Sequence, residues 1–420
     1  MNASYFFSNM RFFASAGFLV FLFLFIFGMP TPIGSLTPLL TLGVIAWGVV
    51  YYKKNFLYMP KAIFYLFIFL LFDLLVSLII PIILSTYDFS IIQTKVNFFV
   101  SILATYFLAK YMLDQNISSK KFFNLLLKVF VLQSILIVGM LLNSELSQSI
   151  TSFTRDSDQG MRVLDTYSGA RGLGVADSSA FGLAIVMGFF IFLSFFAYKN
   201  KYINFYFFIF LLLIGVVASI SAGRTAMLGL FFGGGYLFFN AKNLRAFIML
   251  VSTLLIVFCV GYVLLNVEQT SIKNETLALF YSYSMEPILN YTNTGGFSST
   301  STDALQDMYF PLTEQQFLLG DGRYTDGVKY YLSTDAGYMR FVLFYGAFFS
   351  FLLYAAFALF VLKVVSINKK YTLLCFMLLI FSFILHYKGE VILFAVSYNK
   401  VLFLILFYIL SEGARNKKAL

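Results

Sequence analysis

The stretch AIFYLFIFLLFDLLVSLIIPIIL (62–84) is apolar over nearly its whole length and is long enough to cross a membrane as a single helix. A spanning helix needs about 20 mostly apolar residues. Hydrophobic residues make up 60% of the 420-residue chain, charged residues make up 11%, and the mean hydropathy is +0.86. These values exclude an ordinary globular domain and predict an all-α, polytopic membrane protein.

Similar apolar runs recur along the chain and predict about twelve transmembrane helices in one integral membrane domain over 1–420. The first run has no small-residue cleavage site, so we expect a retained helix and not a removed signal peptide. Cys259 and Cys375 both fall in apolar runs, which predicts neither a disulfide nor a metal site. The runs lie at 12–29, 36–52, 62–84, 96–112, 123–142, 180–198, 203–220, 225–239, 246–265, 338–362, 371–387 and 391–411.

Lysines in the short connections indicate the orientation, because cytoplasmic loops of membrane proteins are enriched in basic residues. The rule places both termini in the cytoplasm and two large loops, 143–179 and 266–336, outside. The cytoplasmic loops are short and carry no nucleotide-binding glycine motif, so sugar nucleotides and ATP are not expected as direct donors. Since the placement of each charge matters more than the net charge of +10, nucleic acid is not an expected partner. The basic positions used are Lys53, Lys54, Lys120, Lys121, Lys199, Lys201, Lys242, Arg245, Lys369, Lys370, Arg415, Lys417 and Lys418.

The longest polar interval, 266–340, is where water-facing chemistry is expected. It closes with LLGDGRYTDG (318–327) and TDAGYMR (334–340). Its first half predicts a helix lying on the membrane surface, because apolar residues recur there at helical spacing. These residues are Leu277, Phe280, Tyr281, Met285 and Ile288.

Arginines are placed against the bias that the lysines follow. A guanidinium binds phosphate through two parallel hydrogen bonds and stays charged, so outer arginines suit an anionic partner. For Arg155 and Arg162 the alternative is a loop salt bridge with a neighbouring aspartate. The arginines that map to the outer side are Arg155, Arg162, Arg171, Arg224, Arg323 and Arg340.

Two of these arginines lie at membrane ends of predicted helices. Arg224 lies in ASISAGRTAMLG (218–229), a small-residue turn where an arginine costs roughly 2.5 to 3.5 kcal/mol unless it faces a cavity and a partner. Gly223 would allow a phosphate to approach the backbone closely. Arg340 begins the tenth predicted helix, where it either binds an anion or forms a capping pair with Asp335.

The segment FILHYKGE (383–390) supplies further candidates. Glu390 is a candidate base, because a carboxylate at a low-dielectric membrane edge is expected to have a raised pKa and to accept a proton from a sugar hydroxyl. The alternative is an interfacial pair with Lys388. His386, the single histidine, is either structural or catalytic.

Lys400 either reaches a cavity, or the last helix begins later than 391. Tyr324 and Tyr338 are candidates for stacking on sugar rings, although interfacial aromatic belts explain such tyrosines equally well.

The segment SAGRTA (221–226), the long outer loop, and GDGRY with DAGYMRFVLFYG (335–346) resemble the O-antigen polymerase (Wzy) family of the O-antigen ligase and polymerase superfamily. The resemblance implies a metal-independent and cofactor-independent GT-C type glycosyltransferase of the bacterial inner membrane, with its active site facing the periplasm. It also implies transfer of an undecaprenyl-diphosphate-linked polymer onto a new undecaprenyl-diphosphate-linked repeat unit. A chain-length regulator is a further candidate partner, beside membrane lipid.

The resemblance assigns outer arginines to the diphosphates. On this hypothesis Arg224 and Arg340 hold the donor diphosphate, Arg171 and Arg323 hold the acceptor or its diphosphate, and Glu390 is the base. Related ligases use a histidine near the large outer loop, and this chain has none between 266 and 340, so polymerase is favoured over ligase, while His386 keeps the ligase alternative open. A flippase for the same lipid-linked sugars is the alternative from another class.

Overall fold

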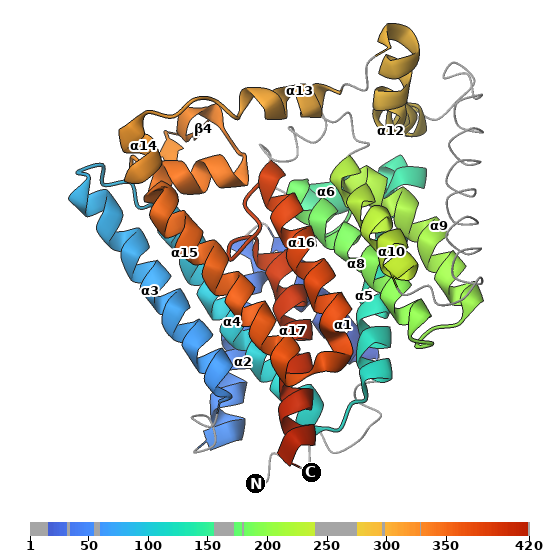
Figure 1. The fold of residues 1–420 in the computed structure, drawn as a ribbon. Helices are drawn as coiled ribbons and strands as arrows, with labels where there is room; N and C mark the ends of the chain where they lie inside the picture. The colour runs from blue at the N-terminus through green and yellow to red at the C-terminus, as the bar shows by residue number, and fades with distance from the viewer. Residues whose placement is uncertain are drawn as a thin grey trace. The chain divides into compact units, whose positions relative to one another are not determined.

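The computed structural model describes residues 16–31, 34–53, 59–154, 172–178, 180–239, 275–295, 299–327 and 329–418. Within these residues the structure is almost entirely helical, and its strands form only two short hairpins (Figure 1). The chain divides into two compact units. Unit 1 comprises Met1–Thr37 and Ile117–Ser299, and unit 2 comprises Pro38–Asn116 and Thr300–Leu420.

Unit 1 is built around α8, which packs against α9 and α10, while α5 packs against α1 and α9. Its elements are α1 (Ala16–Phe27), β1 (Pro30–Thr31), β2 (Gly34–Ser35), α5 (Ser119–Leu142), α6 (Ser144–Thr154), α8 (Phe181–Lys199), α9 (Phe205–Ala222), the 3-10 helix η3 (Arg224–Met227), α10 (Leu228–Phe239) and α12 (Glu275–Thr294).

Unit 2 is built around α4 and α15. The helix α17 packs against α4, and α15 packs against α3, α16 and α17. Its elements are α2 (Leu36–Tyr52, whose first turn contains the boundary between the units), α3 (Lys61–Ile83), α4 (Ser90–Asp114), α13 (Thr300–Asp307), α14 (Glu314–Leu318), β3 (Thr325–Asp326), β4 (Lys329–Tyr330), η5 (Tyr331–Ser333), α15 (Gly337–Ile367), η6 (Lys369–Tyr371), α16 (Thr372–Lys388) and α17 (Val396–Lys418).

Eight helices among the described residues are long and apolar enough to cross a membrane, so the protein is a multi-pass helical membrane protein. Two shorter apolar helices, α1 and α2, match the first two predicted runs. The run at 225–239 contains η3 and the 12-residue α10, and the run at 246–265 lies outside the described residues. The count of about twelve crossings therefore stays a prediction. The eight helices are Lys61–Ile83, Ser90–Asp114, Ser119–Leu142, Phe181–Lys199, Phe205–Ala222, Gly337–Ile367, Lys369–Lys388 and Val396–Asn416.

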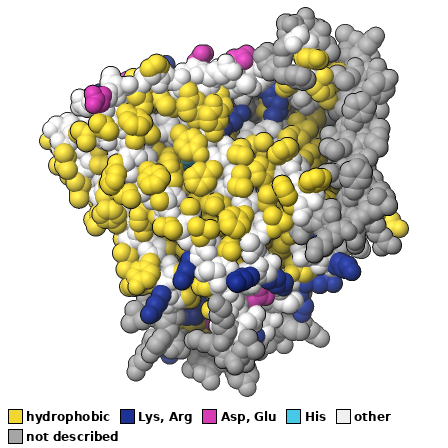
Figure 2. All heavy atoms as spheres, in the orientation of Figure 1, with side chains coloured by type: hydrophobic (Ala, Val, Ile, Leu, Met, Phe, Trp, Pro, Cys, Tyr) yellow, Lys and Arg dark blue, Asp and Glu magenta, His cyan; other side chains and the backbone are white. Residues whose placement is uncertain are grey.

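Basic side chains gather at one end of unit 2. Lys369 and Lys370 lie in the turn between α15 and α16, and Asn368 beside them donates a hydrogen bond to the carbonyl of Ile409 in α17 at 3.1 Å. At the same end, Arg415 donates to the carbonyl of Leu113 in α4 at 3.1 Å. Figure 2 shows hydrophobic side chains over the flanks of these helices and lysine and arginine side chains at this end. Such a distribution is typical of helices that cross a membrane.

The helix α15 is two segments joined by a bend at Gly346 (Figure 1). Gly346 has φ 77° and ψ 166°, a backbone conformation that essentially only glycine adopts. Because the bend interrupts the helical hydrogen bonds, the carbonyl of Leu343 is open to another donor, and it accepts the amide of Asp321 at 2.6 Å. The bend was not expected from the uninterrupted apolar pattern of 338–362. It separates a short first segment that carries Arg340 from the long apolar segment.

We expect Gly346→Ala to destabilise unit 2. A methyl group at this position would clash with the carbonyl group of Leu318 at the end of α14, and alanine would be strained at positive φ. Strain of this kind costs about 1 to 3 kcal/mol, so the midpoint of thermal unfolding in detergent should fall. Gly43→Ala in α2 is the matched control, because nothing lies within 4 Å of its added methyl group. Equal midpoints for the two variants would contradict a structural role for the bend.

Candidate functional site

The loop after α14 is held by the connection between α3 and α4. The carboxylate of Asp88, between α3 and α4, accepts the amides of Tyr324 at 2.6 Å and Thr325 at 2.7 Å. The hydroxyl of Thr86 donates to the carbonyl of Gly322 at 2.8 Å. Gly322 has φ 63°, which suits glycine and lets the loop turn beside α3. The predicted motif GDGRY is therefore a fixed loop that presents Tyr324.

A buried cluster forms where Tyr324, Arg340 and Glu390 meet. Arg340 Nη1 lies 3.3 Å from Oε2 of Glu390, and Arg340 Nη2 donates to the carbonyl of Tyr324 at 3.3 Å. The hydroxyl of Tyr324 donates to the same Glu390 oxygen at 2.7 Å. The side chains of Arg340 and Glu390 are 4% and 8% exposed. We call these three residues the Arg340 cluster.

The guanidinium of Arg340 is stacked between two tyrosine rings. Its central carbon lies 3.8 Å from the ring centre of Tyr324 and 3.9 Å from that of Tyr330, which is 50% exposed. Stacking on aromatic faces stabilises a cation and fixes the plane of the guanidinium. Tyr330 therefore separates Arg340 from solvent on one side.

The carboxylate of Glu390 has an unusual environment. Burial raises the pKa of Glu390, while the Arg340 charge and the Tyr324 hydrogen bond act in the opposite direction. Burial and the Glu390 carboxylate together hold the pKa of Tyr324 well above its ordinary value, so its hydroxyl stays protonated and donates. The second oxygen of Glu390, Oε1, is buried and has no hydrogen-bond partner among the described residues. A buried acceptor left unpaired costs about 1 to 3 kcal/mol, so it is suited to receive a hydroxyl donor from a bound molecule.

The close approach of α15 to the end of α16 depends on Gly337. A methyl group there would clash with the carbonyl groups of His386 and Gly389. The first residue of α15 can therefore touch the α16–α17 connection, and this brings Arg340 within reach of Glu390. The capping pair of Arg340 with Asp335 is not observed, because the N-cap of α15 is Ala336 and no side chain caps the helix.

His386 is buried and hydrogen-bonded within this connection. It is 0% exposed, its Nδ1 accepts the amides of Val391 at 3.0 Å and Ile392 at 3.1 Å, and its Nε2 lies 3.1 Å from the hydroxyl of Tyr354. Because Nδ1 accepts two amide protons, the ring proton is assigned to Nε2, which donates to Tyr354. Both ring nitrogens are thus engaged, and His386 fixes the turn that carries Glu390.

Other predicted residues lie beside the Arg340 cluster. Arg323 is exposed in the loop next to Tyr324. Tyr338 donates to the carbonyl of Phe383 at 2.9 Å and packs edge-on against His386, so it faces α16. Lys388 donates to Ser301 at 2.9 Å, whereas the ion pair of Glu390 is with Arg340. Lys400 is 1% exposed in α17, which begins at Val396, so the last helix begins later than 391.

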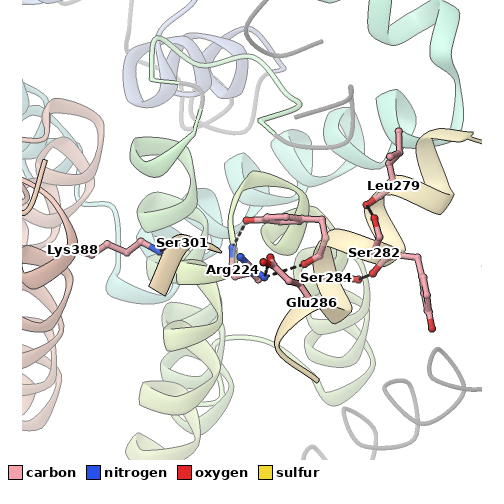
Figure 3. Close-up of polar contacts among 9 residues, drawn as sticks. Arg224, Leu279, Ser282, Ser284, Glu286, Ser301 and Lys388 are labelled. Atoms are coloured by element: carbon pink, nitrogen blue, oxygen red, sulfur yellow. Dashed lines mark hydrogen bonds and ion pairs between the residues drawn. The ribbon is translucent and has the colours of Figure 1, made fainter. Parts of the chain in front are cut away.

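Arg224 forms a separate cluster in unit 1. Its guanidinium pairs with Glu286 of α12, with side chains 17% and 24% exposed (Figure 3). The helix predicted from apolar spacing in this part of the loop is confirmed as α12. Gly223 allows α9 to end against Ala184 of α8, because an added methyl group would lie 2.8 Å from the Ala184 side chain. Arg155, Arg162 and Arg171 lie outside the described residues.

A second buried ion pair of unit 2, between Lys95 and Asp73, was not predicted from the sequence. Lys95 Nζ lies 2.9 Å from Oδ2 of Asp73, whose Oδ1 accepts the hydroxyl of Tyr345 at 3.0 Å. Lys95 and Asp73 are each 2% exposed. A carboxylate in the middle of the apolar run 62–84 was the available signal, because ionisable residues inside membrane helices usually have a partner and a function.

We expect the Asp88 contacts to give unit 2 a stability that depends on pH. Burial acts to raise the pKa of Asp88, but hydrogen bonds from Ser90, Thr325 and Tyr324 together lower it. A carboxyl whose pKa is lower in the folded state stabilises fully above its unfolded pKa of about 3.9 and loses this contribution as pH falls through the folded pKa. Asp88→Asn should therefore unfold at a lower temperature than wild type at pH 7, and the difference should shrink below about pH 4. A difference that is constant from pH 7 to pH 3 would contradict this explanation.

The fold and the Arg340 cluster define a class: a multi-pass helical membrane protein with a buried arginine, carboxylate and tyrosine at the end of unit 2 opposite its basic end. Among the described residues, no group of three or more histidine, cysteine, aspartate or glutamate side chains is placed to hold a metal ion. In comparisons with known proteins, no family model, no curated protein and no solved structure matches the chain.

Proposed function

We propose that the protein is an O-antigen polymerase of the bacterial inner membrane. It transfers an undecaprenyl-diphosphate-linked polysaccharide onto a new undecaprenyl-diphosphate-linked repeat unit on the periplasmic side. The observation that carries the proposal is the Arg340 cluster, in which a buried carboxylate has one oxygen held by Arg340 and Tyr324 and the other unpaired. This arrangement suits a base that receives the hydroxyl of an acceptor sugar.

In the proposed reaction, Glu390 Oε1 accepts a hydrogen bond from the acceptor hydroxyl and takes its proton as the new glycosidic C–O bond forms. The bond between the anomeric carbon and the donor diphosphate breaks, and undecaprenyl diphosphate leaves with the electron pair. Arg340 and Tyr324 keep Glu390 oriented and favour its charged form. The proton then passes from Glu390 to water, which restores the base.

Neutralising the leaving group is the second requirement of this chemistry. Arg171, Arg224, Arg323 and Arg340 are the candidate ligands for the diphosphates. Arg323 is exposed and can be reached directly, whereas Arg340 lies beneath Tyr330, so a diphosphate reaches it when that ring turns aside. In this proposal Tyr324 orients the base Glu390 through its hydrogen bond. Tyr338, whose hydroxyl donates to the carbonyl of Phe383, remains a candidate for contact with sugar.

The ligase alternative depends on His386, whose ring nitrogens are both engaged within the protein. The flippase alternative has one observation in its favour, the Lys95–Asp73 pair within spanning helices, because transporters often carry charges deep in the membrane. Polymerase is preferred because the unpaired carboxylate oxygen suits a reaction and has no evident use in transport.

The test is reconstitution of the purified protein in vesicles with a defined lipid-linked repeat supplied only at the outer face. Lengthening of the saccharide supports the polymerase, and translocation without lengthening supports the flippase. Transfer to added lipid A-core without lengthening would support the ligase. In cells, Arg224→Ala and Arg340→Ala at matched protein level should shorten the polysaccharide on a gel, and wild-type chain length in both would contradict their assignment.

A further inference from the structure

The guanidinium of Arg224 is occupied by groups from one turn of α12. Its Nη1 lies 2.6 Å from Oε2 of Glu286 and donates to the carbonyl of Tyr283 at 3.3 Å. The amide of Arg224 donates to the hydroxyl of Tyr283 at 3.3 Å, and the guanidinium carbon lies 4.6 Å from the centre of that ring. Figure 3 shows Arg224 and Glu286 directed toward each other. The turn thus supplies a carboxylate, a carbonyl and an aromatic face.

Pro287 explains why a helix carbonyl is open to Arg224. In an α-helix the carbonyl of Tyr283 would accept the amide of the residue four positions later, which is Pro287 within α12. Proline has no amide hydrogen, so this carbonyl loses its helical donor. Arg224 Nη1 takes that place. The carbonyl contact is therefore a fixed property of the backbone and does not depend on the Glu286 side chain.

The Glu286 contact differs from the Tyr283 contacts in being exchangeable. Tyr281 and Met285 of α12 are each 6% exposed, and α12 packs against α5 and α9, so apolar contacts also hold this helix in unit 1. The Glu286 side chain is 24% exposed, so water reaches the ion pair and weakens it relative to a fully buried pair. Carboxylate and phosphate oxygens bind a guanidinium with the same geometry. An incoming phosphate oxygen can therefore take the position of the Glu286 oxygen.

We propose that Glu286 is an internal competitor for the anion that binds Arg224, and that this anion is a diphosphate. The inference rests on the proposed function, in which Arg224 is a candidate diphosphate ligand, and adds a control on its occupancy. Tyr283 and Pro287 keep the guanidinium in place while one anion replaces the other. Arg224 is never left without a counter-charge during the exchange. A substrate with two phosphate groups displaces the single carboxylate, whereas weaker anions do not.

The test is a calorimetric titration that measures the affinity of the detergent-purified full chain for inorganic pyrophosphate. Glu286→Gln keeps the size of the side chain and removes its charge. It should bind pyrophosphate at least about tenfold more tightly than wild type, the factor expected when a competing charge-assisted hydrogen bond is weakened. Glu145→Gln is the matched control, because Glu145 is an exposed residue of α6 in the same unit and the change in net charge is identical. Arg224→Ala should remove the gain when it is combined with Glu286→Gln.

Unchanged or weaker pyrophosphate binding by Glu286→Gln would overturn the inference, provided that its unfolding midpoint matches that of Glu145→Gln. Should the midpoint fall, Glu286→Asp offers a second measurement, because a shortened carboxylate keeps the charge, loosens the contact and should give an intermediate affinity. A gain for inorganic phosphate but not for pyrophosphate would overturn the diphosphate assignment. If wild type forms polymer but Glu286→Gln does not bind pyrophosphate more tightly, the inference is overturned and the proposed function stands. If Glu286→Gln binds pyrophosphate more tightly but wild type forms no polymer, the proposed function is overturned and the inference stands.

Discussion

Glu390→Gln should reduce polymer formation by about 10²- to 10⁴-fold, the range expected when a general base is removed. Glutamine keeps an acceptor for the hydroxyl of Tyr324, but it cannot take a proton from an acceptor sugar and cannot balance the charge of Arg340. Polymer made from a defined lipid-linked repeat would be measured per mole of folded protein. Because burial raises the pKa of Glu390 and the base works deprotonated, the wild-type rate should rise with pH through that raised pKa.

The control for this change is Glu314→Gln, on the exposed first turn of α14 in the same unit. It makes the same change in charge without touching the Arg340 cluster. Loss of the ion pair will also lower the stability of Glu390→Gln, so the amount of polymer is compared at equal amounts of folded protein. A Glu390→Gln variant that polymerises within a few-fold of the control would remove Glu390 from the proposed reaction.

The second large effect concerns the Lys95–Asp73 pair. Lys95→Met should destabilise unit 2 by about 3 to 5 kcal/mol, because it leaves the Asp73 carboxylate buried without its counter-charge. The loss should also loosen the first segment of α15, since Tyr345 beside the bend donates to Asp73 at 3.0 Å. Unfolding midpoints in detergent would report the change. Replacing both partners by Lys95→Met with Asp73→Leu should recover most of it, as hydrophobic residues of similar volume can replace a buried ion pair.

The double variant also distinguishes a structural role of the Lys95–Asp73 pair from a role in transport. A pair that only holds α3, α4 and α15 together can be replaced by apolar side chains with the proposed polymerase activity retained. A pair that carries charge across the membrane cannot. Additive losses in the two single variants and the double variant would contradict a direct interaction between Lys95 and Asp73.

The helices could be predicted from the sequence because each long apolar run has only one way to satisfy its backbone in a membrane. Eight runs are confirmed as long helices. The bend at Gly346 could not be predicted, because the apolar pattern continues through it and a glycine inside a membrane helix is common. Lys400 was ambiguous until the structure placed the start of α17 at Val396.

The candidate site was only partly predictable. Residue chemistry pointed to Arg340, Glu390 and Tyr324 one at a time, but their meeting depends on Gly337 and on the loop held by Asp88. These are tertiary contacts between distant parts of the chain, and no local pattern encodes them. In the same way, the chemistry of Arg224 was recognised, while its carboxylate partner on α12 was not.

Because α15 bends at Gly346, the number of residues between Arg340 and Gly346 determines the direction in which the Arg340 side chain points. The carbonyl of Leu343 and the bend fix the first segment to the loop of Asp321, so the direction of every side chain before the bend is set from that point. One residue inserted between Arg340 and Gly346 would rotate Arg340 by about 100° around the helix axis and carry its guanidinium away from Glu390. An insertion after the bend would only lengthen the apolar segment. Proteins that share this cluster should therefore keep the number of residues between the arginine and the glycine fixed, while the length beyond the glycine varies with the thickness of the membrane.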